Sequence, residues 1–398
     1  MKLQLAGWLL SAGLLGTAWI APEPANPFVL VSEAARVGPV GSVNYLLPLL
    51  ELRRQRPAYL QGAQVGTYWQ ALATFAAMAS ELDSVAYYWR QQPGYAAPAP
   101  VAAPATALPL AAATILAQTK ARQLVLFNEE HTQPRGRWLV GSLLPALYQQ
   151  GFRYLALEAL EAADSAGLRQ RGYPVAASGF YTNEPHFGNL IRQARQLGFH
   201  VIAYDAFSED RECDQARNLL AATLGPHPQA RVVVLAGHGH INENSTAQTM
   251  ATWVHKLSGI DPLTIEQTHA AAGGPASWAT LKPGAYLVPP ASLPGRSLTC
   301  DLYVLNKLAL AGAGNGFGNP AARPTRLVIP PDSLRPPQVL LVYYQREKQA
   351  QAGAVPVAVH CLRPRETSVH LPLLPGTYVA ELRTAPGLRC WQKTFSVL

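Results

Sequence analysis

Between residues 124 and 235, short runs of apolar residues alternate with segments of helical character, and this alternation limits the possible folds more than any other feature of the chain. The apolar runs are 124–127, 154–157, 200–204 and 232–235. Gly151 and Gly198 stand at the ends of two intervening segments, where a left-handed residue commonly terminates a helix. Uninterrupted apolar strands that alternate with helices are typical of a parallel sheet buried on both faces. The sequence therefore predicts an α/β fold in which helices cover a parallel sheet.

The rest of the chain differs from this region in composition, and 398 residues are enough for two or three domains. Helical spacing precedes an Ala/Pro-rich stretch, and short strands separated by Pro and Gly turns follow the α/β region. The expected parts are a signal peptide at 1–21, a helical segment at 22–92, a linker at 93–115, the α/β domain at 116–296, a connection at 297–322 and a small all-β sandwich at 323–398. We expect the helical segment to cap the α/β domain, and the sandwich to fold separately as an accessory module.

The N-terminus has the composition of a secretory signal. Residues 3–21 are largely apolar and carry no charge, and a single lysine precedes them. The small residues at 16–18 are suited to cleavage by signal peptidase. The sequence therefore predicts export, with a mature protein that is periplasmic, extracellular or associated with the cell envelope. An uncleaved membrane anchor is the alternative.

The charged residues do not predict a nucleic-acid partner. Lys and Arg number 32 against 24 Asp and Glu, a formal net charge of +8, but the basic residues are scattered and form no cluster. A surplus of this kind favours solubility or association with an anionic surface such as the cell envelope.

The four cysteines do not predict a zinc site, because Cys213, Cys300, Cys361 and Cys390 are too far apart in the sequence. Cys361 and Cys390 both fall in the last segment, where they could form a disulfide or stay as two separate thiols.

Polar side chains that can do chemistry follow each of the four apolar runs. In an open parallel sheet, ligands bind outside the carboxyl ends of the strands. The candidates at these ends are Glu129 and His131, Glu158, Asp205, and His238 with His240. Arg211 and Asn218 are seven residues apart in the following helical segment, hence on one helical face. Carboxylates beside imidazoles can supply a base and its orienting partner, and an arginine can stabilise negative charge.

These strand ends resemble one protein superfamily. Asn128-Glu129-Glu130-His131 is similar to the G-E-x-H signature of erythromycin esterases and ChaN-like haem-binding proteins. Ala156-Leu157-Glu158 resembles their second-strand glutamate, and Gly237-His238-Gly239-His240 their late glycine and histidine. Residues 211–218 resemble the esterase R-D-x-x-M-A-x-N helix, and the whole resemblance covers about residues 123–267.

The chain also departs from this pattern. Asn128 and Gln215 stand where the family has Gly and Met, and His240 comes one residue earlier than the second histidine of the esterase A-H-N-x-H pattern. The resemblance implies an active or ligand-binding site built on Glu129, His131, Glu158, Arg211 and His240, with the substrate unspecified.

The first functional interpretation is a secreted hydrolase of small-molecule or peptide-like esters or amides. His131 or Glu129 would deprotonate a water molecule, and Glu158 would orient the histidine. Arg211 would position the substrate or stabilise the oxyanion, and His240 would protonate the leaving group. Asp205, Asn218 and His238 are candidates for substrate binding. The α/β region lacks a Gly-x-Ser-x-Gly motif, which favours water over serine as the nucleophile.

Other interpretations stay open. Glu129, His131 and His240 could hold a divalent metal ion with an open position, as a distant similarity to Tiki-type metalloproteases implies. The ChaN-like relatives imply instead a haem-binding or iron-uptake protein without turnover, with histidine or tyrosine as axial ligand. A third interpretation is a structural protein whose sandwich mediates cell-surface contacts. The hydrolase interpretation requires no cofactor, and the sequence indicates no particular oligomeric state.

The export hypothesis predicts that the protein isolated from its native host lacks roughly the first 18 to 25 residues. Mass spectrometry of the intact protein measures this directly. An intact Met1 on a cytoplasmic product would contradict it.

Overall fold

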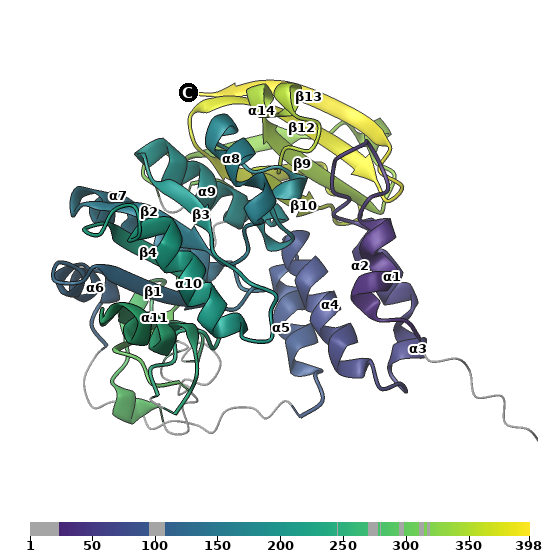
Figure 1. Cartoon of the computed structure of the whole chain (residues 1–398). Coiled ribbons are helices and arrows are strands. Elements are labelled where there is room, and N and C mark those ends of the chain that lie inside the picture. The colour runs from purple at the N-terminus through teal and green to yellow at the C-terminus, as the bar shows by residue number, and fades with distance from the viewer. Residues whose placement is uncertain are drawn as a thin grey trace, which may run out of the picture.

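The computed structural model describes residues 24–94, 108–244, 246–269, 278, 280–293, 298–309, 314–316 and 319–398. The chain forms an N-terminal group of helices, a central α/β region and a C-terminal β region (Figure 1). The expected signal peptide and most of the expected Ala/Pro-rich linker lie outside the described residues. Within the described residues, no helix combines the length and the apolar character needed to cross a bilayer.

The N-terminal group consists of the helices α1 (Pro27–Ala34), α2 (Leu47–Arg54), α3 (Arg56–Tyr59), α4 (Val65–Met78) and α5 (Leu82–Arg90). Helix α4 is rich in alanine and aromatic residues, and almost every residue from Tyr68 onwards is buried. A helix that is apolar on all sides must be covered on all sides. The expected helical segment is therefore present, with α4 at its centre.

The central region is built on a seven-stranded sheet with the strand order β3-β2-β4-β1-β5-β7-β6. Its strands are β1 (Leu124–Glu129), β2 (Phe152–Leu157), β3 (His200–Ala203), β4 (Arg231–Gly237), β5 (Leu263–Glu266), β6 (Ala285–Leu287) and β7 (Leu302–Asn306). All neighbouring strands are parallel except β6, which is antiparallel to β7. The expected α/β fold with a parallel sheet is confirmed.

Helices cover both faces of this sheet. One face packs against α6 (Ala111–Thr119), α7 (Arg135–Gln149), α8 (Ser165–Arg171) and α9 (Pro185–Leu197). The other face packs against α10 (Arg211–Thr223) and α11 (Met250–Ser258). Alternate residues of β1 belong to the two cores, with Val125 and Phe127 on one side and Leu124 and Leu126 on the other. This is why the apolar runs show no polar alternation.

Two expected boundaries of the α/β region are wrong. Helix α6 begins at Ala111, inside the expected linker 93–115. Pro109 is the last proline of this stretch, and the alanine-rich residues that follow it favour a helix. Strand β7 lies in the expected connection 297–322, yet it pairs with β5 and β6 and so belongs to the sheet. The pairing of β7 is set by partners that are distant along the chain, which a local pattern does not reveal.

The C-terminal region contains β8 (Arg323–Val328), β9 (Gln338–Tyr344), α14 (Gln345–Ala350), β10 (Ala358–Cys361), β11 (Ser368–Leu373), β12 (Gly376–Thr384) and β13 (Arg389–Val397). A four-stranded antiparallel sheet, β10-β9-β12-β13, packs against the pair β11-β8. The expected antiparallel β region is confirmed. All four cysteines are free, so Cys361 and Cys390 are not bridged.

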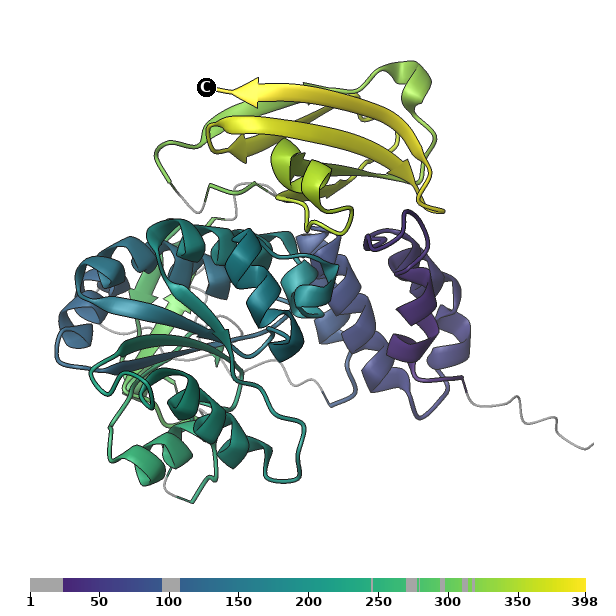
Figure 2. The ribbon, with the colours of Figure 1, turned by 45° about the horizontal axis from the view of Figure 1, so that its top comes forward.

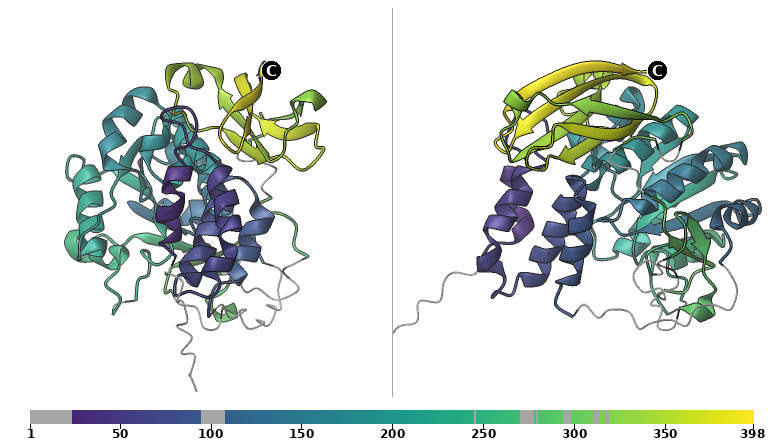
Figure 3. Two further views of the ribbon diagram at one scale, coloured as in Figure 1. Left: turned by 90° about the vertical axis from the view of Figure 1, so that its right-hand side faces the viewer. Right: turned by 180° about the vertical axis from the view of Figure 1, so that it is seen from behind.

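The outer face of the four-stranded sheet shares a hydrophobic core with the N-terminal helices. Val339, Leu341 and Tyr343 of β9 are in the same buried cluster as Leu72 and Phe75 of α4. Figure 2 shows the C-terminal sheet lying across both the helices and the α/β region, and the rear view of Figure 3 agrees. The N-terminal helices thus cover the C-terminal sheet in addition to meeting the α/β region. This shared core argues against the expectation that residues 323–398 fold separately as an accessory module.

Truncation after Pro320 should therefore cost the rest of the chain its native melting transition. The deletion removes the sheet that covers the apolar helices and exposes that buried surface to water. Calorimetry of the truncated and full-length proteins measures the effect. The control is Leu388→Ala, because Leu388 is 69% exposed and should change stability by less than about 0.5 kcal/mol. A soluble remainder with unchanged melting would show instead that residues 323–398 are independent.

Candidate functional site

The carboxyl ends of β1, β4 and β2 bring the main candidate residues together. Because β4 lies between β1 and β2, Gly237 at its end separates His131, which follows β1, from Glu158, which follows β2. A Cβ atom at position 237 would lie 3.0 Å from Glu158 Oε2 and 3.3 Å from His131 Nε2. The imidazole and the carboxylate therefore face one point over Gly237, and only glycine leaves that space free.

His131 is oriented by the carboxylate two residues before it. Its Nδ1 lies 2.8 Å from Glu129 Oε1, which leaves Nε2 directed toward Gly237. One face of the ring stacks on Tyr181, with centroids 4.2 Å apart and an interplanar angle of 22°. The sequence interpretation assigned the orienting role to Glu158, but the structure places Glu129 in that position.

Glu129 is itself held by Arg137, which sequence analysis did not single out. Arg137 Nε donates to Glu129 Oε2 at 2.7 Å, and Nη2 donates to Glu129 Oε1 at 3.0 Å and to the carbonyl of His131 at 2.8 Å. Nη1 donates to Glu184 Oε2 at 2.7 Å. Arg137 is fully buried. Arg137 directly precedes the apolar stretch Trp138-Leu139-Val140 and follows Arg135-Gly136, so its position in the sequence gave little signal that it is buried. In the structure its charge is matched by carboxylate partners, as a buried arginine requires.

Glu158 accepts hydrogen bonds from three directions. Arg211 Nη2 donates to its Oε1 at 2.8 Å, and the backbone N–H of Gly237 donates to its Oε2. His240 Nε2 lies 3.3 Å from Oε1. The predicted residues Glu158, Arg211 and His240 are thus in one contact group, and Glu158 binds His240 in place of the predicted His131.

His240 has a second carboxylate that the sequence interpretation missed. Its Nδ1 lies 2.7 Å from Glu212 Oε1, and the other oxygen of Glu212 accepts from the backbone N–H of Met250 at 2.6 Å. Glu212 is adjacent to Arg211 in the first turn of α10. An acidic residue there is usually explained by the helix dipole, and for that reason it gave no separate signal.

Charge interactions shift the pKa values on both sides of Gly237. Burial alone would lower the pKa of His240, but hydrogen bonds to Glu158 and Glu212 raise it to about 9. Burial would likewise lower the pKa of His131, but the hydrogen bond to Glu129 and the charges of Glu129 and Glu158 raise it above its usual value.

The carboxylates respond in the opposite sense. Burial alone would raise the pKa of Glu158, but His240 lowers it to about 2. Burial is also outweighed at Glu129, where the charges of Arg137 and His131 lower the pKa. At neutral pH, His240 is therefore a cation between two carboxylates, and both strand-end glutamates are ionised.

The three predicted substrate-binding residues have other partners. Asp205 Oδ1 accepts from Arg211 Nε at 3.1 Å and from Gln215 Nε2 at 2.6 Å. Asn218 donates to the carbonyls of Tyr204 and Asp205, so it supports the end of β3. His238 is exposed, and its Nδ1 lies 2.7 Å from Thr268 Oγ1. Asp205 thus positions Arg211, while within the described residues no hydrogen bond or ion pair joins the side chain of Asn218 or His238 to His131 or His240.

The predicted metal ligands are not assembled into one set. Both oxygens of Glu129 accept hydrogen bonds from Arg137, and a metal ion would have to displace that buried cation. His240 Nε2 contacts Glu158 and not Glu129. Among the residues that the structure describes, no group of three His, Cys, Asp or Glu side chains is placed to hold a metal ion.

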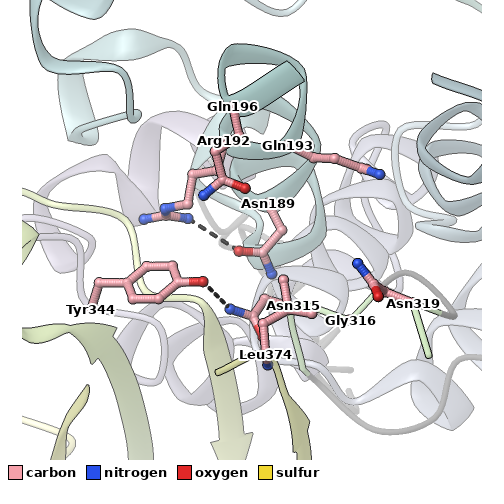
Figure 4. Close-up of a pocket in the computed structure, with 9 residues that line it drawn as sticks. All are labelled: Asn189, Arg192, Gln193, Gln196, Asn315, Gly316, Asn319, Tyr344 and Leu374. Carbon is pink, nitrogen blue, oxygen red and sulfur yellow. Dashed lines mark hydrogen bonds between the residues drawn. The ribbon is translucent and has the colours of Figure 1, made fainter. Parts of the chain in front are cut away.

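A pocket of about 50 Å³ lies away from this cluster, between α9 and the C-terminal region (Figure 4). Arg192, Asn189 and Asn315 line it, and each is already hydrogen bonded: Arg192 Nη1 donates to Asn189 Oδ1 at 3.2 Å, and Asn315 Nδ2 donates to the Tyr344 hydroxyl at 2.8 Å. The pocket contains none of the predicted site residues, so it is not the place where the strand-end chemistry occurs.

The His240 contacts predict a pH dependence of stability. Since the folded-state pKa of about 9 is higher than the usual value of 6.5, these contacts stabilise the fold fully below about pH 6.5 and are lost as the pH rises through 9. The free energy of unfolding should fall over this range by at most about 3 kcal/mol. Denaturant titrations at several pH values measure it. His240→Gln should reduce this slope, leaving the part that the raised pKa of His131 contributes, and the exposed control His370→Gln should keep it whole. An equal slope in all three proteins would contradict the assignment.

No protein-family model and no curated protein matches this chain. Among solved structures it is similar to the type III effector HopBA1, with 12% identity over 52% of this chain and 100% of that one, and a TM-score of 0.35. It is also similar to RRSP, a MARTX toxin effector domain from Vibrio vulnificus, with 15% identity over 59% of this chain and 50% of that one, and a TM-score of 0.30. A bacterial protein toxin gives 14% identity over 56% of this chain and 53% of that one, with a TM-score of 0.31. The chain spans about half the length of these last two proteins.

Proposed function

We propose that the protein is a hydrolase in which water attacks an ester or amide carbonyl over Gly237. The observation that carries the proposal is that both imidazoles lie near Glu158 and each is backed by its own carboxylate. His240 Nε2 is 3.3 Å from Glu158, and His131 Nε2 faces the same point over Gly237 as the Glu158 carboxylate. A histidine oriented by a carboxylate is suited to general acid–base catalysis. The resemblance of the strand-end motifs to erythromycin esterases supports the same reaction class.

In this mechanism His131 is the general base. Glu129 accepts a hydrogen bond from the N–H at Nδ1, so the lone pair of Nε2 faces the space over Gly237. Nε2 removes a proton from water as the oxygen forms its bond to the carbonyl carbon. Glu158 is a poor base because its pKa is about 2, and Glu129 has no free oxygen. The sequence left open whether His131 or Glu129 is the general base, and we therefore propose His131.

Arg211 and His240 neutralise the negative charge that develops on the oxyanion and on the leaving group. Arg211 Nη1 has no hydrogen-bond partner within the described part of the chain, and the side chain is 38% exposed. It can therefore donate to the oxyanion of the tetrahedral intermediate. His240 is protonated at neutral pH, and it gives a proton to the departing alcohol or amine as the carbon–oxygen or carbon–nitrogen bond breaks. Solvent then removes the proton from His131 and restores the one on His240.

The test is the hydrolysis of a panel of esters and amides by wild type, His131→Gln, Glu129→Gln and the double variant. Each single variant should lower kcat/KM by roughly 10²- to 10⁴-fold, and the double variant should lose little more because the pair acts as one unit. Melting temperatures are measured in parallel. His370→Gln, at an exposed position, is the control. Equal activity in all proteins, or losses that follow unfolding, would contradict the proposal, and a Soret shift with haemin would then favour the haem-binding alternative.

The pH profile of kcat/KM provides an independent prediction. As the pH falls, activity should be lost at a pH above the usual pKa of histidine, because His131 becomes protonated. As the pH rises, activity should be lost near pH 9, because His240 loses its proton. Arg137→Lys should shift the acid limb, because it changes how Glu129 is held, and leave the alkaline limb in place. A profile that is flat between pH 6 and 10 would exclude both assignments.

A further inference from the structure

A row of aromatic side chains connects the N-terminal helices to the proposed catalytic imidazole. Tyr181 stacks on His131, and Phe180 meets Tyr181 edge to face with centroids 5.0 Å apart. Phe180 then contacts Phe28 at 6.3 Å and Phe75 at 6.0 Å, both in edge-to-face geometry. We call Phe28, Phe75, Phe180 and Tyr181 the aromatic row. It forms an apolar wall on one side of His131.

Phe180 is the exposed member of this row. Phe75 is buried in the core shared by the helices and the C-terminal sheet, and Tyr181 packs against the core of the α/β region. Phe180 lies at the seam between these two cores and keeps 43% of its surface exposed. Phe180 reaches the proposed catalytic imidazole through Tyr181, whose ring lies between it and His131. Exposed apolar side chains next to a few polar groups are a common feature of ligand sites.

The backbone holds Phe180 in this position. Gly179 lies against the carbonyl of Ala159, just after the end of β2, and a Cβ atom there would clash with that oxygen. The Asn183 amide donates to the carbonyl of Gly179 at 2.9 Å and to that of Phe180 at 3.3 Å. The Tyr45 hydroxyl, from the N-terminal segment, donates to the carbonyl of Asn183 at 2.9 Å. The wall is therefore preformed, and binding against it costs little ordering entropy.

The other sides of the cluster are polar. Arg211 and His240 both bind Glu158, and within the described residues Arg211 Nη1 has no hydrogen-bond partner. A substrate whose carbonyl lies between His131 and Arg211 therefore meets charged groups on one side and aromatic rings on the other.

We propose that the aromatic row is a specificity surface, and that the protein prefers esters or amides that carry an aromatic or bulky apolar group next to the scissile bond. This inference rests on the proposed hydrolase function, of which it names the substrate class. The apolar group packs on the exposed face of Phe180, while the carbonyl carbon lies over Gly237. One well-packed apolar group is worth about 10- to 200-fold in selectivity.

The experiment compares ethyl acetate with ethyl phenylacetate and benzyl acetate, with acid release followed in a pH-stat. The variants are Phe180→Ala and Phe180→Leu, and the control is Tyr87→Ala, an exposed aromatic residue of α5 outside the row. Wild type should prefer ethyl phenylacetate and benzyl acetate, the two esters that carry a phenyl ring. Phe180→Ala should lower the ratio of kcat/KM for these two esters over ethyl acetate by about tenfold, mainly through KM, and Phe180→Leu should restore part of this ratio. Tyr87→Ala should match wild type.

A binding measurement separates failure of this inference from failure of the proposed function. Benzyl methyl ketone and butanone resemble the esters but cannot be hydrolysed, and calorimetry measures their affinities for wild type and Phe180→Ala. Tighter binding of the phenyl ketone that Phe180→Ala removes, without turnover of any ester, would support the surface and contradict the hydrolase. Turnover with no preference for phenyl groups, or losses in Phe180→Ala that are equal for large and small compounds, would overturn the surface and leave the hydrolase standing.

Discussion

The buried guanidinium of Arg137 is the interaction on which the rest of the site depends. It neutralises Glu129 at the end of β1 and Glu184 at the start of α9, and it also binds the backbone of His131. A buried charge is costly unless its hydrogen bonds are satisfied, so the strand end, the histidine loop and the helix must adopt one arrangement together. Removing the arginine would leave two buried carboxylates without a partner, which typically destabilises a protein by about 3–5 kcal/mol.

Helix α9 extends this constraint to the C-terminal region. Its N-terminus carries Glu184, which accepts the backbone N–H groups of His186 and Phe187, and one face carries Arg192. Arg192 forms a buried ion pair with Glu347 of α14 at 2.6 Å. The N-terminal helices share a core with the same C-terminal sheet. The parts of the chain therefore support the site jointly, and Phe180 lies where their cores meet.

The two proposed catalytic histidines differ because their surroundings differ. His240 lies between Glu158 and Glu212 and is a cation at neutral pH. His131 has one direct carboxylate partner, which is shared with Arg137, and its other nitrogen faces Gly237. Pairs of titratable groups with different environments commonly divide into an acid and a base. This asymmetry is the reason why we propose His240 as the acid and His131 as the base.

The sequence by itself determined the α/β class, the β-rich C-terminal region and the edge of the sheet where Glu129, His131, Glu158, Arg211 and His240 gather, because apolar periodicity and strand ends are local patterns. It did not determine which carboxylate orients which histidine, since that depends on β4 lying between β1 and β2. Nor did it determine the roles of Arg137, Glu212 and Tyr181, the strand β7 or the shared core. Their partners are distant along the chain, and only tertiary packing brings those partners into contact.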